Sequence, residues 1–146
     1  MGKNGKNFNV YKYRTMIQES SGIGWTEVND SRISTAGKIL RFTYLDELPQ
    51  SVNLILGNMS VVGPRPEQIE IVEKLRELIP FYDERHLVKP GLTGWAQVRC
   101  PYGASAKAAL EKLQYDLYYI KNQSLILDTI ILFETARIVL FGKLAR

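Results

Sequence analysis

The sequence is poor in the side chains that build disulfide frameworks, zinc sites and most nucleophile–base pairs. Its 146 residues include one cysteine, Cys100, and one histidine, His86. A lone cysteine forms no intrachain disulfide, and it has no CxxC-type companion for a structural zinc site. Because no nucleophile lies near His86 in the sequence, we expect this residue to have a structural or surface role.

Long apolar runs and nucleotide-binding glycine motifs are also missing. No stretch of about 20 apolar residues predicts a bilayer-spanning helix, and the basic start at residues 1–6 lacks the apolar stretch of a secretory signal. Neither the P-loop spacing nor a GxGxxG after a strand occurs. Since the Lys and Arg residues are dispersed and form no known nucleic-acid motif, we expect no nucleic-acid partner, and a basic nucleic-acid-binding module is the weaker alternative.

The sequence does have enough apolar residues for a core, and a modest positive charge. It is 45% hydrophobic with a formal net charge of +4, and no linker or repeat divides residues 1–146, so one domain is expected. The charge suits an anionic partner such as a phosphorylated small molecule, an anionic lipid headgroup or a nucleic acid.

Apolar periodicity and turn residues predict an α+β fold that is mostly helical, with a few short strands and surface amphipathic helices. A strand is predicted over residues 8–16, a loop over residues 22–34 and a turn over residues 89–94. Helices are predicted over residues 35–44, 49–56, 66–79, 105–121 and 124–142.

The last predicted helix is strongly apolar, but its charges do not lie on one side. Asp128, Glu134 and Arg137 fall around the whole circumference of residues 125–141. Three charges and this length argue against a bilayer span. Two alternatives remain open here: a core helix with paired charges, and a helix on a membrane surface.

An acid pair, Asp46 and Glu47, stands just ahead of Pro49 and between two arginines, Arg41 and Arg65. Carboxylates hold metal ions or attack electrophiles, and arginines bind phosphate. A plainer explanation is helix capping, because acids at a helix N-terminus contribute roughly 0.3–1 kcal/mol through the dipole. The residues alone leave both explanations open.

Further basic and aromatic residues have a similar double interpretation. Lys12 and Arg14 share one face of the predicted strand, where they would hold a diphosphate or form a solvated face. Trp25 and Trp95 would stack on a base, lie at a lipid interface or pack in the core. The residues alone therefore indicate an anion-binding domain, in which the acid pair is either a metal or nucleophile site or a helix cap.

A series of motifs covers nearly the whole chain. It comprises Tyr11-Lys12-Tyr13-Arg14-Thr15-Met16, Asn29-Asp30-Ser31-Arg32-Ile33, Leu45-Asp46-Glu47-Leu48-Pro49-Gln50, Met59-Ser60-Val61-Val62-Gly63-Pro64-Arg65-Pro66, Lys89-Pro90-Gly91-Leu92-Thr93-Gly94-Trp95-Ala96-Gln97-Val98 and Tyr115-Asp116-Leu117-Tyr118-Tyr119-Ile120-Lys121-Asn122. This series resembles the bacterial sugar transferase family, the monotopic polyprenyl-phosphate phosphoglycosyltransferases. Residues 101–105 and 111–114 further resemble its exopolysaccharide branch, which is associated with exosortase-type systems.

The resemblance implies transfer of a sugar-1-phosphate from a UDP-sugar to undecaprenyl (polyprenyl) phosphate, with release of UMP, as the first membrane step of exopolysaccharide biosynthesis. By position, Asp46 would be the nucleophile that forms a covalent aspartyl-phosphosugar intermediate, and Glu47 would assist metal placement or proton transfer. Both would be ligands of Mg2+. The residues expected to bind the substrate phosphates are Lys12, Arg14, Arg41 and Arg65.

The resemblance also implies a location on the cytoplasmic face of a bacterial inner membrane, with the membrane surface as a partner; a homo-oligomer is left open. The sequence departs from the family at Asn58, where members usually carry Asp or Glu. It also begins inside the family pattern, so we expect the catalytic domain without its N-terminal membrane segment. The alternative is a catalytically inactive, membrane-associated remnant.

Overall fold

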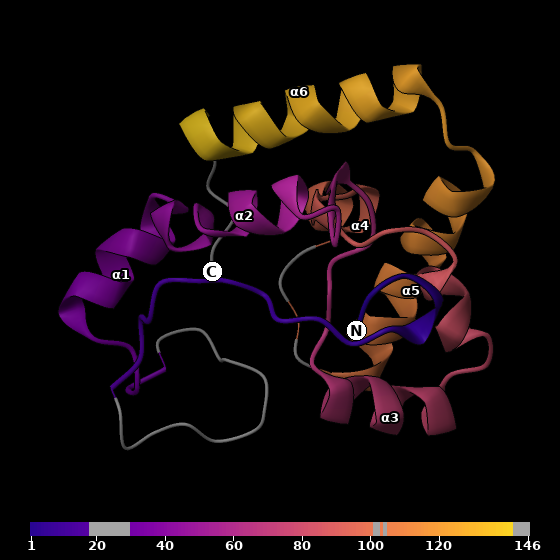
Figure 1. Cartoon of the computed structure of the whole chain (residues 1–146), viewed down its shortest axis with the longest axis horizontal. Helices are drawn as coiled ribbons and strands as arrows, with labels where there is room; N and C mark the ends of the chain where they lie inside the picture. The colour runs from indigo at the N-terminus through magenta and orange to yellow at the C-terminus, as the bar shows by residue number, and fades with distance from the viewer. Residues whose placement is uncertain (18–29, 101–102, 104, 142–146) are drawn as a thin grey trace.

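Helices predominate in the structure, a computed structural model that describes residues 1–17, 30–100, 103 and 105–141 (Figure 1). The α-helices are α1 (Thr35–Phe42), α2 (Gln50–Ile55), α3 (Ile69–Leu78), α4 (Trp95–Arg99), α5 (Ala106–Lys121) and α6 (Leu125–Phe141). Short 3-10 helices are η1 (Lys3–Gly5), η3 (Leu45–Glu47) and η4 (Tyr82–His86), and the strands are β1 (Ser60–Val62) and β2 (Gly91–Thr93). The predicted mostly helical α+β class is confirmed.

Serine caps explain why several helices begin where the sequence predicts. The hydroxyl oxygens of Ser34, Ser105 and Ser124 each accept a hydrogen bond from the backbone N–H three residues further on, at 3.0, 3.1 and 3.2 Å. Such caps satisfy one of the N–H groups that have no partner within the first helical turn. The predicted helices over residues 35–44, 49–56, 105–121 and 124–142 are confirmed as α1, α2, α5 and α6; Gly142 lies outside the described residues.

One predicted strand and the start of one predicted helix were wrong. Residues 8–16 form no strand, because their only strand-type pairing with the described residues is an isolated bridge between Met16 and Ile33. The helix predicted from residue 66 begins at Ile69, because Gln68 still has an extended backbone. Most of the predicted loop at residues 22–34 lies outside the described residues.

The predicted turn at residues 89–94 contains strand β2, which pairs in parallel with β1 through Ser60–Gly91 and Val62–Thr93. Glycine makes this pairing possible, because a Cβ on Gly91 would lie 2.1 Å from the backbone nitrogen of Gly63. The glycine in this predicted turn therefore allows the two backbones to approach each other closely. The strand pair places the Gly63-Pro64-Arg65 segment directly after β1.

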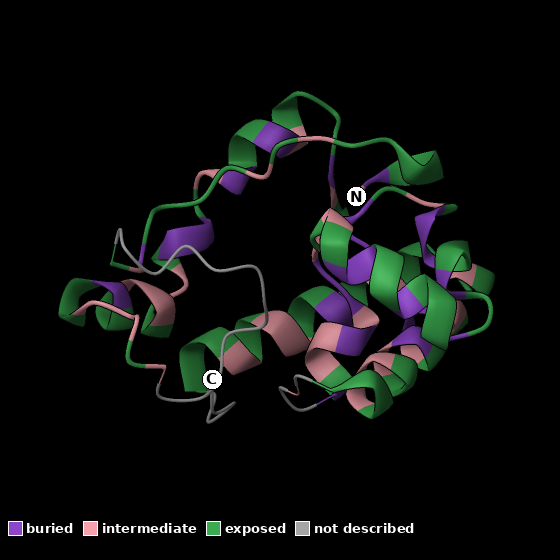
Figure 2. Cartoon of the chain, turned by 90° about the horizontal axis from the view of Figure 1, so that it is seen from below, coloured by how far each residue is buried: buried purple, intermediate pink, exposed green. Residues whose placement is uncertain are grey.

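The core lies on both sides of α5. On one side, Leu113 packs with α3 and with Tyr82 of η4. On the other side, Tyr119 packs with Val62 of β1 and with Ile131, the fully buried residue of α6. Figure 2 shows buried residues gathered mainly on the right of the molecule, where α3 and α5 lie.

Helix α6 is a surface helix rather than a core helix. Ile131 is buried, but Leu125, Ile126, Phe133 and Leu140 are all at least 70% exposed. Within the described ranges, no helix combines the length and the apolar character that crossing a bilayer requires. Of the two alternatives left open by the sequence, the buried core helix is therefore wrong.

Candidate functional site

The acid pair is buried in the short turn between α1 and α2. Asp46 is 6% exposed and Glu47 is 9% exposed. Tyr44 has a left-handed backbone (φ 58°) that separates α1 from η3, and Pro49 then precedes α2. This sharp reversal turns the acid pair inward, whereas simple capping residues would remain in water.

Glu47 is the point where two distant cations meet. Its Oε1 accepts hydrogen bonds from Lys12 Nζ at 3.1 Å and from Arg65 Nη2 at 2.5 Å. Burial lowers the pKa of the Lys12 ammonium, Arg65 lowers it further, and Glu47 raises it in part. The Glu47 carboxylate therefore offsets the mutual repulsion of the two cations.

Asp46 lies within the same cluster of charges. Its carboxylate acts electrostatically on both Lys12 and Arg65, raising the pKa of each. Its backbone oxygen accepts a hydrogen bond from the N–H of Tyr13 at 3.0 Å, so the extended segment that carries Lys12 lies directly against η3. Four of the six predicted site residues, Lys12, Asp46, Glu47 and Arg65, are therefore brought together.

The other two predicted phosphate-binding residues have different surroundings. Arg41 donates from Nε to the hydroxyl of Thr15 at 2.9 Å, which fixes it against the end of the extended segment. Arg14 is exposed, and the described part of the chain offers its side chain no ion-pair partner. Their role in binding phosphate stays a prediction.

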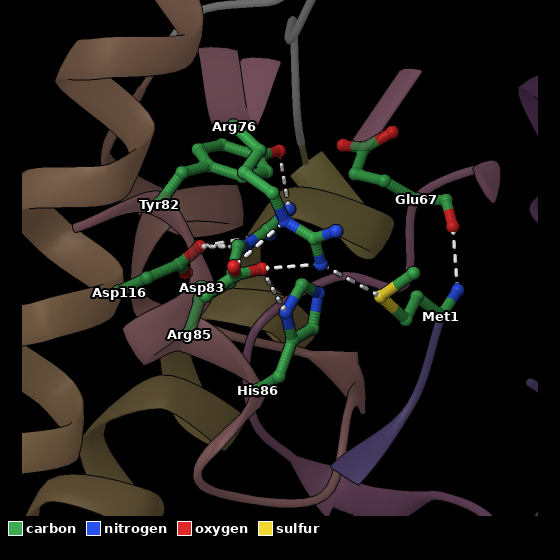
Figure 3. Close-up of polar contacts among 8 residues, drawn as sticks. All are labelled: Met1, Glu67, Arg76, Tyr82, Asp83, Arg85, His86 and Asp116. Carbon is green, nitrogen blue, oxygen red and sulfur yellow. Dashed lines mark hydrogen bonds and ion pairs between the residues drawn. The ribbon is translucent and has the colours of Figure 1, made fainter. Parts of the chain in front are cut away.

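The backbone of Arg65 is hydrogen-bonded to Arg85, a member of a buried ion pair that the sequence did not predict. Arg85 donates from Nη2 to the backbone oxygen of Arg65 at 2.9 Å and to Asp116 Oδ2 at 2.8 Å. Its Nη1 also donates to the hydroxyl of Tyr82 at 2.8 Å (Figure 3). Burial raises the pKa of Asp116, and the Arg85 guanidinium opposes this shift.

The chemistry of the acid pair fits the Mg2+ that the resemblance implies. Mg2+ keeps several waters and is commonly bound through one or two carboxylates together with substrate phosphates. Among the residues that the structure describes, no group of three or more His, Cys, Asp or Glu side chains forms a metal cage. Glu47 Oε1 already accepts from two cations, and binding of Mg2+ by Asp46 and by Glu47 stays a prediction.

Trp95, His86 and Cys100, which the sequence also singled out, pack in or against the core. Trp95 contributes to the cluster around Val62, stacks on Tyr118 with ring centroids 6.4 Å apart and lies under the Arg99 guanidinium. Trp25 lies outside the described residues. Burial lowers the pKa of His86 to about 4 and raises that of Cys100 to about 11, so both side chains are uncharged at neutral pH.

Comparison with known proteins places this site in a family context. The chain matches the model of the bacterial sugar transferase family over residues 1–142. It is 45% identical to the UDP-N-acetylgalactosamine-undecaprenyl-phosphate N-acetylgalactosaminephosphotransferase of Aeromonas hydrophila, with 100% of this chain and 35% of that protein covered. It is 44% identical to the exopolysaccharide production protein PSS of Rhizobium leguminosarum bv. phaseoli, covering 92% of this chain and 71% of that protein.

A third relative indicates that the donor sugar varies among similar proteins. The chain is 41% identical to the UDP-glucose:undecaprenyl-phosphate glucose-1-phosphate transferase of Escherichia coli strain K12, with 92% of this chain and 30% of that protein covered. The chain thus spans about a third of the length of two of these three relatives. The family match covers residues 1–142, which include the segment with Lys12 and all of α6. The chain belongs to the bacterial sugar transferase family.

Proposed function

We propose that this chain is the catalytic part of a phosphoglycosyltransferase that moves a sugar-1-phosphate from a UDP-sugar to undecaprenyl phosphate and releases UMP. The observation that carries the proposal is the buried Asp46–Glu47 pair, with Lys12 and Arg65 both bound to Glu47 Oε1. The names of its relatives support the same reaction class, because two of them are undecaprenyl-phosphate sugar phosphotransferases.

The reaction proceeds in two displacements at one phosphorus atom. A carboxylate oxygen of Asp46 attacks the phosphorus that bears the sugar, and the bond from this phosphorus to the bridging oxygen breaks. The bridging oxygen leaves with its electron pair as part of UMP. An oxygen of undecaprenyl phosphate then attacks the same phosphorus, which breaks the bond to Asp46 and regenerates the carboxylate.

Lys12 and Arg65 make the first attack electrostatically feasible. A carboxylate and a diphosphate repel each other, so cations must offset the negative charge before the two can meet. Glu47 keeps both cations beside Asp46 in the absence of substrate, and the diphosphate then competes with Glu47 for their N–H groups. Mg2+ held by Asp46 and the donor phosphates would neutralise further phosphate charge.

The test of this function is UMP release. The chain is incubated with detergent-dispersed undecaprenyl phosphate, Mg2+ and, separately, UDP-glucose or UDP-N-acetylgalactosamine. We expect UMP from at least one donor, with dependence on both the lipid phosphate and Mg2+. UMP formation in none of a broad panel of UDP-sugars, by protein that is folded by circular dichroism, would instead favour the inactive remnant.

We further propose that the side bearing α2 and α6 contacts the cytoplasmic face of a bacterial inner membrane. Ile55 of α2 and Phe42 of α1 are 86% and 84% exposed, and Phe133 and Leu140 of α6 are 70% and 72% exposed. In Figure 1, α2 and α6 run across the upper part of the molecule, whereas α3 lies at the bottom. Exposed apolar residues on this scale mark an interaction surface, and a lipid-phosphate substrate makes the bilayer its natural partner.

Vesicle binding checks this surface. We expect the double substitution Ile55→Ser and Phe133→Ser to weaken cosedimentation with anionic phospholipid vesicles by about tenfold or more, since each buried apolar side chain contributes on the order of 1 kcal/mol. The matched control is Leu78→Ser, because Leu78 is 67% exposed but lies on α3. Equal losses in both variants would show that α2 and α6 do not form the contact.

A further inference from the structure

Residues 9–13 are extended next to the acid pair without forming a strand, so their backbone groups must bind elsewhere. The side chain of Asn53, on α2, supplies two of these partners. Its Oδ1 accepts from the N–H of Tyr11 at 3.1 Å, and its Nδ2 donates to the backbone oxygen of Asn9 at 2.7 Å. A primary amide is suited to this role because it offers a donor and an acceptor side by side.

A third hydrogen bond lies on the other side of Lys12. The N–H of Tyr13 donates to the backbone oxygen of Asp46. The residues before and after Lys12 are therefore both tied to the η3–α2 region that carries the acid pair. With its backbone fixed at both neighbours, the Lys12 side chain reaches Glu47 Oε1 at 3.1 Å.

We propose that Asn53 is a positioning residue that holds Lys12 against Glu47. Asn53 is 0% exposed, so its amide makes these hydrogen bonds shielded from water. Its backbone oxygen also accepts from the N–H groups of Asn58 and Met59, which fixes the residue where the chain leaves α2 toward β1. The role of Lys12 toward a diphosphate rests on the proposed function, but the placement of Lys12 does not.

A general structural role of Asn53 would have different consequences. Loss of a buried amide that merely stabilises the fold would lower stability without a selective effect on Lys12. Loss of a positioning amide would release Lys12 from Glu47 and into water, even in protein that stays folded. The measurement must therefore follow Lys12 itself.

The first experiment measures the rate of Lys12 acetylation at a fixed pH by mass spectrometry, normalised to the exposed Lys107 in the same sample. Because Lys12 Nζ donates to Glu47 Oε1 at 3.1 Å, we expect its amine to be acetylated more slowly than that of Lys107. In Asn53→Ala the acetylation rate of Lys12 is expected to rise toward that of Lys107. Tyr119→Phe is the control, since it removes a part-buried hydrogen bond from Tyr119 of α5 to Asp128 of α6.

Asn53→Asp provides a second variant in case Asn53→Ala does not fold. Aspartate keeps the acceptor for Tyr11 but replaces the donor to Asn9 with a second oxygen, so we expect the same direction of change. An unchanged acetylation rate of Lys12 in either folded variant would overturn the proposal. This readout needs no turnover, so it remains decisive even if the proposed function fails.

The second experiment is a double-mutant cycle on UMP release. Asn53→Ala is expected to lower kcat/KM for the UDP-sugar by about 10- to 100-fold, because misplacing a binding group by about 1 Å costs up to this much. In a Lys12→Ala background the same substitution is expected to change kcat/KM by less than about threefold, since no Lys12 remains to be positioned. Equal losses in the two backgrounds would assign Asn53 a structural role only.

Discussion

Replacing Asp46 by Asn is expected to lower the rate of UMP release by about 1,000-fold or more while leaving the fold intact. Asparagine has nearly the same shape as aspartate, but its amide oxygen carries no full negative charge and is a poor nucleophile toward phosphorus. Asp46 is 6% exposed, and asparagine fills the same buried space. Comparable single losses of a nucleophile in other enzymes have effects of this order.

Mass spectrometry distinguishes a nucleophilic role of Asp46 from a purely electrostatic role. Parent protein incubated with the donor and Mg2+, without lipid phosphate, is expected to gain the mass of one sugar phosphate on the peptide that contains Asp46. Asp46→Asn should gain none. The matched control is Asp83→Asn, an exposed carboxylate that pairs with Arg76 at 2.7 Å and lies outside the acid cluster. Substantial turnover by Asp46→Asn would show that another residue is the nucleophile.

The helices could be predicted from the sequence because their signals are local. Serine caps precede α1, α5 and α6, and Pro49 precedes α2, so each of these signals lies within a few residues of the helix that it predicts. The extended segment at residues 8–16 was predicted as a strand from the same kind of pattern. Alternation does not specify a pairing partner, and Asn53 and Asp46 instead form three hydrogen bonds with the backbone of this segment.

The sequence predicted which residues form the site but not how they contact one another. Family motifs pointed to Lys12, Asp46, Glu47 and Arg65, and the structure brings these four together. That both cations bind one oxygen of Glu47 depends on the tertiary contacts of segments up to 53 residues apart. A sequence pattern carries no information on such geometry.

The supporting residues were missed for a related reason. Asp116 and Arg85 look like ordinary surface charges in the sequence, because nothing local indicates that α5 and η4 bury them together. Only the packing of α5 between two clusters shows that Asp116 is 1% exposed. Buried charges are usually paired, so the pairing of Arg85 with Asp116 can be inferred from the fold but not from the composition.

Replacing Asp116 by Ala is expected to lower the free energy of unfolding by about 3–5 kcal/mol, which a urea titration would detect as a lower midpoint. The substitution leaves the Arg85 guanidinium, 6% exposed, without its buried counter-ion. The matched control is Asp83→Ala, which breaks the exposed pair with Arg76 and is expected to change the midpoint little. Equal effects of the two substitutions would show that burial of the Arg85–Asp116 pair does not matter for stability.

An apolar replacement of the pair then separates stability from positioning. In Arg85→Met combined with Asp116→Leu, no buried charge is left unpaired, so much of the lost stability is expected to return. The backbone oxygen of Arg65 nevertheless loses the hydrogen bond from Arg85 Nη2. If that bond orients Arg65 toward Glu47, kcat/KM for UMP release stays lowered in the stable double variant. Recovery of both quantities would show that β1 and the following turn place Arg65 without help from Arg85.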